Sequence, residues 1–163
     1  MPHEATTNAT TGSLADFTRC DLIVPQLRER DAAGIIGELS RVLRQADCVP
    51  DVLSFYQAVL NQEILSSSAA CSGMIVAHAR LGGVKRLQFA FGRAASPVVW
   101  NTKSLWPAQL IFLLAVPATE SARHLQLLSG LARLAQDPEA AAELLAAPDA
   151  PAILAVLNEI RMQ

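Results

Sequence analysis

The sequence has no strongly basic stretch and no apolar run long enough to cross a bilayer. Its Lys and Arg residues number 13 against 15 Asp and Glu, which gives a formal net charge of -2. A nucleic-acid-binding surface shows as a Lys/Arg patch, so we expect no nucleic-acid partner. A spanning helix needs roughly 20 apolar residues, whereas the longest apolar run near a predicted strand covers 109–118. The N-terminus also lacks the basic and then apolar layout of a signal peptide, so we expect no membrane association.

Cysteine and histidine are also scarce. Cys20, Cys48 and Cys71 are odd in number and have no Cys-x-x-Cys spacing. This pattern favours a reduced, cytoplasmic protein over a disulfide framework. The three histidines and the scattered carboxylates form no cluster with metal-ligand spacing. We therefore predict no metal site and no cofactor.

The length and the composition of the chain suit one domain with a substantial core. The chain has 163 residues, of which 52% are hydrophobic and 17% charged, a size typical of a single domain. Residues 1–13 are rich in Thr, Asn and Ala and have no apolar periodicity, so we expect a disordered tail there. The predicted domain covers 14–163.

Hydrophobic periodicity along 14–163 predicts a single α/β domain with a mixed β-sheet and helices on both faces. No internal repeat or linker divides the chain into two cores. The apolar run at 109–116 indicates a central buried strand, and a hairpin is the simplest connection between strands at 73–79 and 87–92. The predicted strands cover 22–24, 73–79, 87–92 and 109–116, and the predicted helices cover 32–46 and 52–64 and follow Thr119, Pro138 and Pro151.

Acidic or hydroxyl residues precede the predicted helices. Asp31, Asp137 and Asp149 are predicted N-caps, and Thr119 is predicted to cap the helix that follows the fourth strand. This helix has an apolar stripe. Its apolar positions are Leu125, Leu128, Leu131, Ala132, Leu134 and Ala135.

The stretch 66–80 contains the residues most suited to chemistry. A small, hydroxyl-rich loop leads into a strand that places Met74, Val76 and His78 on one face. A neutral imidazole is a nucleophile near pH 7, and loop hydroxyls and N–H groups can hold phosphoryl oxygens. From these residues alone, His78 either accepts a phosphoryl group or only hydrogen-bonds to its neighbours.

Two histidine-containing segments resemble a known family. The first reads Gln62-Glu63, Ser66-Ser67-Ser68, Cys71-Ser72-Gly73 and Ala77-His78-Ala79-Arg80, and the second reads Phe112-Leu113-Leu114-Ala115-Val116-Pro117 and Arg123-His124-Leu125. Together they resemble the IIA domain of the phosphoenolpyruvate-dependent sugar phosphotransferase system, in its fructose/mannitol branch, which includes the nitrogen-regulatory IIA proteins. The resemblance implies the mannitol-type IIA fold.

The resemblance also implies roles for particular residues. His78 corresponds to the phosphorylated histidine of the family, which accepts its phosphoryl group from a small, HPr-like phosphocarrier protein. His124 corresponds to the second active-site histidine, which stabilises the bound group. Ser68 and Gly73 fall in the phosphoryl-binding loop, and Arg80 can add a cation if the strand continues that far.

The sequence departs from the family pattern near both motifs. Gln62 stands where the family has arginine, Ala77 replaces a proline, and Cys71-Ser72 replaces Gly-Asn. Two functions therefore stay open. One is a phosphohistidine carrier of the phosphotransferase system, in a regulatory rather than sugar-transport role, with a downstream regulatory target. The other is a phosphorylation-deficient regulatory binding module of the same fold. A serine- or cysteine-based hydrolase has no G-x-S-x-G motif to support it.

Overall fold

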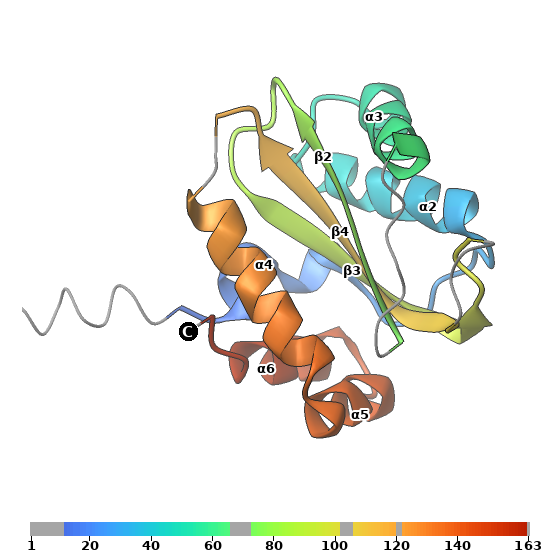
Figure 1. The fold of residues 1–163 in the computed structure, drawn as a ribbon, viewed down its shortest axis with the longest axis vertical. Coiled ribbons are helices and arrows are strands. Elements are labelled where there is room, and N and C mark those ends of the chain that lie inside the picture. The colour runs from blue at the N-terminus through green and yellow to red at the C-terminus, as the bar shows by residue number, and fades with distance from the viewer. Residues whose placement is uncertain (1–11, 66–72, 102–105, 120–121, 163) are drawn as a thin grey trace, which may run out of the picture.

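A computed structural model describes residues 12–65, 73–101, 106–119 and 122–162 of the chain. In this part of the chain a four-stranded mixed sheet lies between two layers of helices (Figure 1). The predicted fold class, a single α/β domain with helices on both faces of a mixed sheet, is confirmed. The predicted tail up to residue 11 and the predicted loop residue Ser68 lie outside the described residues.

The most apolar strand occupies the centre of the sheet. The strands are β1 (Ile23–Val24), β2 (Met74–Leu81), β3 (Gln88–Val98) and β4 (Ala108–Pro117). Their spatial order is β1-β3-β4-β2. Strand β4 pairs antiparallel with β3 and parallel with β2, and all of its residues except Gln109 are buried. The predictions of a central strand at 109–116 and a short edge strand at 22–24 are confirmed.

The predicted hairpin between 73–79 and 87–92 is wrong, because β4 lies between β2 and β3. An apolar strand that is covered on both faces is most stable when the backbone N–H and C=O groups along both of its edges are hydrogen-bonded to neighbouring strands. The connection over 82–87 therefore crosses the end of β4. Crossing one strand means spanning about 10 Å, which six residues easily reach. Side-chain alternation specifies the faces of a strand but does not identify its partner.

The α-helices are α2 (Ala32–Gln45), α3 (Val52–Leu65), α4 (Ala122–Ala135), α5 (Pro138–Ala146) and α6 (Ala150–Asn158). Two short 3-10 helices, η1 (Leu14–Phe17) and η2 (Cys20–Leu22), were not predicted from the sequence.

Three of the predicted helix caps are present. The carboxylates of Asp31, Asp137 and Asp149 accept hydrogen bonds from backbone N–H groups three residues ahead, at 2.7, 3.1 and 3.0 Å. The predicted cap Thr119 is wrong, because α4 begins only at Ala122.

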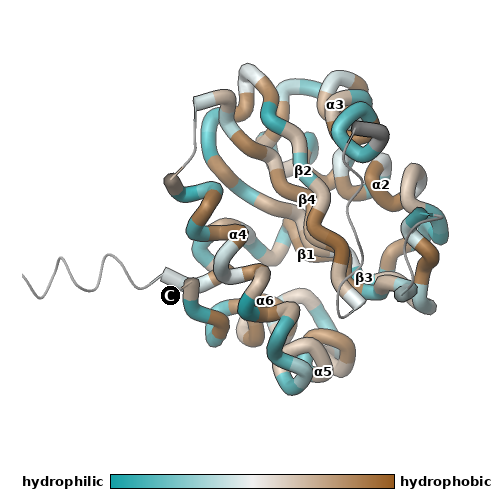
Figure 2. The backbone as a smooth tube through the Cα atoms, viewed as in Figure 1, coloured by the Kyte–Doolittle hydropathy of each residue, from teal (hydrophilic) through white to brown (hydrophobic). Residues whose placement is uncertain are grey.

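The helices form two layers that bury opposite faces of the sheet. Helices α2 and α3 pack on one face, and α4, α5, α6 and η1 pack on the other (Figure 1). Along β2, Ile75 and Ala77 belong to the core under α2 and α3, whereas Met74 and Val76 contact the core under α4 to α6. The hydropathy colouring shows brown residues where the strands run side by side and mixed colours on the helices (Figure 2). The predicted alternation of β2 is therefore confirmed.

Gly12 and Ser13, which precede the predicted domain of 14–163, bond to residues near the C-terminal end. The backbone N–H of Met162 donates to the carbonyl of Gly12 at 3.1 Å, and the buried Ser13 hydroxyl donates to Asn158 Oδ1 at 3.1 Å. The first described residues are thus joined to the C-terminal end, beside α6.

A half-buried arginine on β3 joins the sheet to α5. Arg93 Nε donates to the carbonyl of Pro25 at 2.9 Å, and Nη1 donates to the carbonyls of Leu144 and Ala147, both at 2.7 Å. These acceptors include C-terminal carbonyls of α5, where a cation is favoured by the helix dipole. We predict that R93A lowers the free energy of unfolding by about 2–3 kcal/mol, measured by urea denaturation.

The exposed Arg86, in the loop before β3, provides the matched control. R86A removes the same charge and the same number of side-chain atoms, and should change the unfolding free energy by less than about 0.5 kcal/mol. Equal effects of R93A and R86A would contradict a structural role for the Arg93 hydrogen bonds.

Candidate functional site

Two of the predicted site residues share one face of β2. The strand continues to Leu81, so the condition set for Arg80 is met. Because alternate residues of a strand point to the same side, His78 and Arg80 both face the layer that contains α4. His78 is half-buried, and Arg80 is more exposed.

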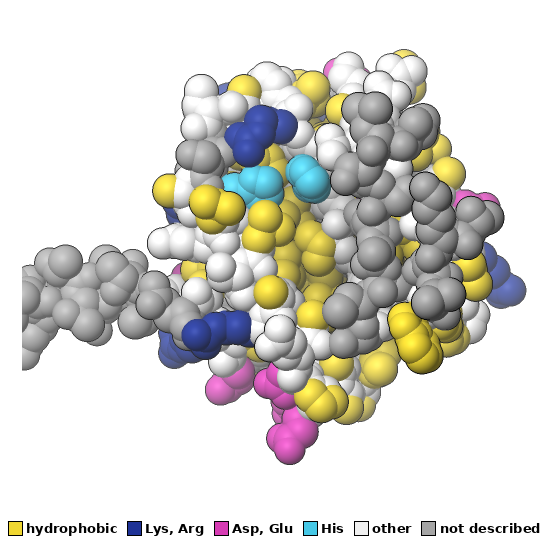
Figure 3. Space-filling model, in the orientation of Figure 1, with side chains coloured by type: hydrophobic (Ala, Val, Ile, Leu, Met, Phe, Trp, Pro, Cys, Tyr) yellow, Lys and Arg dark blue, Asp and Glu magenta, His cyan; other side chains and the backbone are white. Residues whose placement is uncertain are grey.

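The fold brings His124 to His78 from a distant part of the sequence. His124 lies in the first turn of α4 and is buried. The ring centroids of His78 and His124 are 5.6 Å apart, and the ring planes are inclined at 55°. Figure 3 shows the two histidine side chains adjacent at the surface, with a basic side chain and hydrophobic side chains beside them. The two imidazoles therefore belong to one site.

Arg80 contacts the second imidazole of this pair. Its Nη2 lies 3.3 Å from His124 Nδ1. Its Nη1 donates to the carbonyl of Pro117 at 3.2 Å and to that of Ala118 at 3.5 Å, at the C-terminal end of β4. The guanidinium is thus bound to the neighbouring strand on one side and to the His124 ring on the other.

The surroundings of His78 favour its neutral form. Burial lowers the pKa of its imidazole below the ordinary value, and the positive charge of Arg80 lowers it further. The carboxylate of Glu63 acts in the opposite direction and raises this pKa, but the net shift is downward. A neutral imidazole keeps a lone pair on one ring nitrogen, so His78 is a competent nucleophile at neutral pH.

Glu63 is a neighbour that sequence analysis did not assign to the site. It lies near the C-terminal end of α3, and its Oε1 accepts a hydrogen bond from the indole Nε1 of Trp100 at 2.8 Å. Trp100 is buried, which agrees with its interpretation as a packing residue. The Gln62-Glu63 pair was already part of the family resemblance. No sequence pattern indicated the bond to Trp100, which lies 37 residues away.

The start of α4 is anchored so that His124 faces inward. The guanidinium of Arg123 lies 4.8 Å from the centre of the Phe17 ring, in η1. Two of the apolar positions of this helix lie outside its buried face, because Leu125 is 66% exposed and Ala132 is also exposed. In the first turn the histidine, and not the leucine that follows it, points inward. The buried residues of the helix are His124, Leu127, Gly130, Leu131 and Leu134.

The other two predicted site residues belong to the segment before β2. Ser68 lies outside the described residues. Gly73 stands just before β2, five residues before His78, which corresponds to roughly 17 Å of extended strand, so the structure does not bring it to the imidazoles. Its φ of +77° explains the glycine, because other residues rarely adopt this conformation. Its carbonyl accepts hydrogen bonds from the backbone N–H groups of Gln109 and Leu110.

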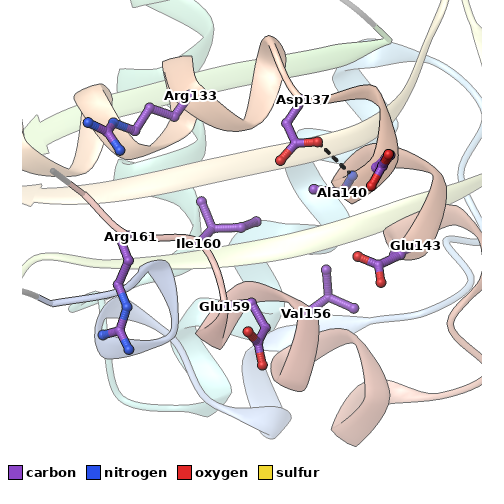
Figure 4. A pocket seen from close by; sticks show the side chains of 9 residues that line it. Arg133, Asp137, Ala140, Glu143, Val156, Glu159, Ile160 and Arg161 are labelled. Carbon is purple, nitrogen blue, oxygen red and sulfur yellow. Dashed lines mark hydrogen bonds between the residues drawn. The ribbon is translucent and has the colours of Figure 1, made fainter.

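A charged hollow lies elsewhere, between α4, α5 and α6 (Figure 4). It has a volume of 330 Å³, and neither histidine of the pair lines it. Among its lining residues, Asp137 is engaged in capping α5, and the side chains of Arg133 and Arg161 flank it opposite Glu143 and Glu159. The hollow is separate from the histidine site.

Within the described segments, no group of three or more His, Cys, Asp or Glu side chains is arranged to hold a metal ion. In the same segments, no helix combines the length and the apolar character that crossing a bilayer requires.

Comparison with known proteins gives the same family along almost the whole chain. The family model described as "Phosphoenolpyruvate-dependent sugar phosphotransferase system, EIIA 2" matches residues 16–160. The "PTS system fructose-specific EIIABC component" of Bacillus subtilis is 29% identical over 133 residues, which cover 82% of this chain and 21% of that protein. The chain thus spans about a fifth of the length of this relative.

Another curated relative matches over nearly its full length. The "Nitrogen regulatory protein" of Bradyrhizobium diazoefficiens is 27% identical over 144 residues, which cover 88% of this chain and 94% of that protein. Among solved structures, Nitrogen Regulatory Protein IIA-Ntr from Neisseria meningitidis superposes with a TM-score of 0.76 at 24% identity, covering 88% of this chain and 98% of that one. The structural likeness supports the same fold.

Proposed function

Because the chain belongs to the EIIA 2 family of the phosphoenolpyruvate-dependent sugar phosphotransferase system, we propose that His78 accepts a phosphoryl group from a phosphorylated histidine of a small phosphocarrier protein. The observation that supports this best is the approach of the His78 and His124 rings to 5.6 Å. In the proposed step, one N–P bond forms on His78 while the N–P bond of the carrier breaks. The electron pair of the broken bond stays on the carrier imidazole.

Positive groups around His78 suit the charge of the transferred group. Phosphoryl transfer depends mainly on positioning and on stabilising charge on the phosphoryl oxygens. Arg80 adds a guanidinium on the same face of β2. His124 lies in the first turn of α4, where the helix dipole favours an anion. Arg80 supplies a cation near the site although Gln62 replaces the arginine of the family pattern.

A regulatory role is supported by the relatives. The relative matched over 94% of its own length is named a nitrogen regulatory protein. We therefore infer that phosphorylation of His78 reports to a downstream regulatory protein rather than serving sugar transport. Exchange with a phosphocarrier implies that both proteins act in the cytoplasm. Ser68 is proposed to contribute a hydroxyl to the phosphoryl oxygens.

The direct test is incubation of the protein with phosphoenolpyruvate and the upstream phosphotransfer proteins. The proposal expects an acid-labile phosphate on this chain, formed only when the phosphocarrier is included. A folded protein that stays unlabelled would contradict the proposal and favour the phosphorylation-deficient binding module.

The lowered pKa of His78 leads to a pH prediction. Since burial and Arg80 outweigh Glu63, His78 should stay neutral as the pH falls through about 6.5, the ordinary histidine value. E63Q removes a carboxylate that raises this pKa, so the His78 pKa in the variant should be lower still. The amide oxygen of the new side chain can keep the bond from Trp100. Ring resonances of His78, followed by NMR between about pH 4 and pH 8, measure both values.

The test is decided by two directions: whether the His78 pKa lies below the ordinary histidine value, and whether E63Q lowers it further. Protonation of His78 above about pH 6.5, or an E63Q variant with a higher His78 pKa than the wild type, would contradict the stated balance of burial and charge. In the wild type, phosphotransfer should decline only at pH values below the His78 pKa, because the protonated ring has no lone pair to attack phosphorus.

A further inference from the structure

The contact between Arg80 and His124 determines which ring nitrogen of His124 carries the proton. Arg80 Nη2 lies 3.3 Å from His124 Nδ1. A guanidinium has five N–H donors and no acceptor, so His124 Nδ1 must be the acceptor in this hydrogen bond. A neutral imidazole that accepts at Nδ1 carries its hydrogen at Nε2.

The guanidinium is held in the orientation that this bond requires. Its Nη1 donates to the carbonyls of Pro117 and Ala118, at 3.2 and 3.5 Å. The parallel register of β2 and β4 sets this geometry, because Arg80 lies opposite Val116 and Leu81 lies opposite Pro117. The sheet therefore positions the guanidinium, and the guanidinium in turn orients the His124 ring.

This tautomer makes the second nitrogen of His124 a donor suited to a phosphoryl group. Nδ1 is bonded to Arg80, and Nε2 is shielded from solvent. An N–H group at a shielded position makes a stronger hydrogen bond than one in water. With the opposite tautomer, Nε2 would present a lone pair to phosphoryl oxygens, which also carry lone pairs and negative charge.

We propose that Arg80 is a positioning residue that fixes His124 as the Nε2–H tautomer and so makes it a hydrogen-bond donor to a phosphoryl group on His78. The inference rests on the proposed function for the identity of the acceptor. The tautomer itself is a property of the unphosphorylated protein and can be measured without any transfer reaction.

Two substitutions at Arg80 test tautomer control, and the ring nitrogens of His124 give the deciding readout. Lysine in R80K has an ammonium that only donates, so it should keep Nδ1 of His124 as an acceptor. Glutamine in R80Q has an amide that both donates and accepts, so either tautomer can bond to it. Arg80 is exposed, so both variants should fold, with urea midpoints close to the wild type.

Long-range nitrogen–proton NMR of the imidazoles at about pH 8, where histidine is neutral, measures the tautomer directly. In the wild type and in R80K, His124 should show a pyrrole-like Nε2 and a pyridine-like Nδ1. In R80Q the two nitrogen shifts should move towards each other, and the rate of phosphoryl transfer should fall about tenfold. R133Q is the control, because it removes the same charge from the last turn of α4 and should leave both readouts unchanged.

The outcomes distinguish this inference from the proposed function. A wild-type His124 with its hydrogen at Nδ1, or an R80Q variant with an unchanged tautomer pattern, would overturn the inference even if His78 is phosphorylated. The expected tautomer pattern in a protein that accepts no phosphoryl group would support tautomer control by Arg80 and overturn the proposed function instead.

Discussion

H78Q is expected to lack the acid-labile phosphate that we propose the wild-type protein acquires from a phosphocarrier. An amide nitrogen is not a nucleophile at neutral pH, because its lone pair is delocalised into the carbonyl. Glutamine still fits a half-buried position on β2 and can form hydrogen bonds there. Labelling with phosphoenolpyruvate and the upstream proteins, followed by acid treatment, measures the result. Labelling of H78Q at the wild-type level would show that another residue is the acceptor.

H124L is the informative companion to H78Q. It leaves the imidazole of His78 in place and replaces the second imidazole, 5.6 Å away, with a buried side chain that cannot donate. We expect H124L to be labelled at a rate about 10²–10³-fold lower than the wild type, the usual cost of losing one donor to developing charge. Rapid-quench kinetics give the rates. An H124L variant as fast as the wild type would exclude a role for this ring in transfer.

F112A is expected to have the largest effect on stability. Phe112 lies on the central strand β4 and is fully buried. Its ring centre is 4.9 Å from that of Phe91 and 5.5 Å from that of Phe89, in the core under α4 to α6. Truncation to alanine removes a buried ring and leaves a cavity, so the free energy of unfolding should fall by about 3–5 kcal/mol.

F112L is the control that shows how much of the stability loss in F112A comes from the cavity. Leucine refills most of the space and should cost less than about 1.5 kcal/mol. Urea denaturation of the three proteins, with the slope checked for two-state behaviour, measures the differences. A loss in F112A no greater than that in F112L would contradict the view that this aromatic cluster dominates the core on the α4 side.

Local features of the fold could be predicted from the sequence because their causes are local. Asp31, Asp137 and Asp149 each satisfy a backbone N–H group three residues ahead, which depends on neighbouring residues alone. The alternation along β2 likewise predicted that Arg80 would share the face of His78 if the strand continued, and β2 does reach Leu81.

The pairing of the strands could not be predicted in the same way. Nothing in the alternation of 73–79 or 87–92 indicates that β4, which comes later in the chain, lies between them. The preference for this strand order arises when β4, which is apolar except for Gln109, is buried at the centre of the sheet. It therefore depends on the whole domain rather than on the connecting loop.

The site was predicted in part. The two imidazoles were identified through their resemblance to a family, since residues 78 and 124 are far apart in the chain. Apolar periodicity gave Leu125 as one of the apolar positions of its helix, whereas the structure exposes Leu125 and buries His124, so a polar residue occupies an inward position that an apolar pattern cannot indicate. The bond from Trp100 to Glu63 links two distant segments and had no signal in the sequence.

The account depends on one phosphoryl group that is attached to His78 and hydrogen-bonded to His124. NMR of the phosphorylated, ¹⁵N-labelled protein measures both relations at once. We predict a ³¹P–¹⁵N coupling to a ring nitrogen of His78, and an Nε2–H proton of His124 that moves downfield and exchanges more slowly on phosphorylation. Phosphorus coupled to any other residue, or a His124 ring whose resonances do not change when His78 is phosphorylated, would contradict the account.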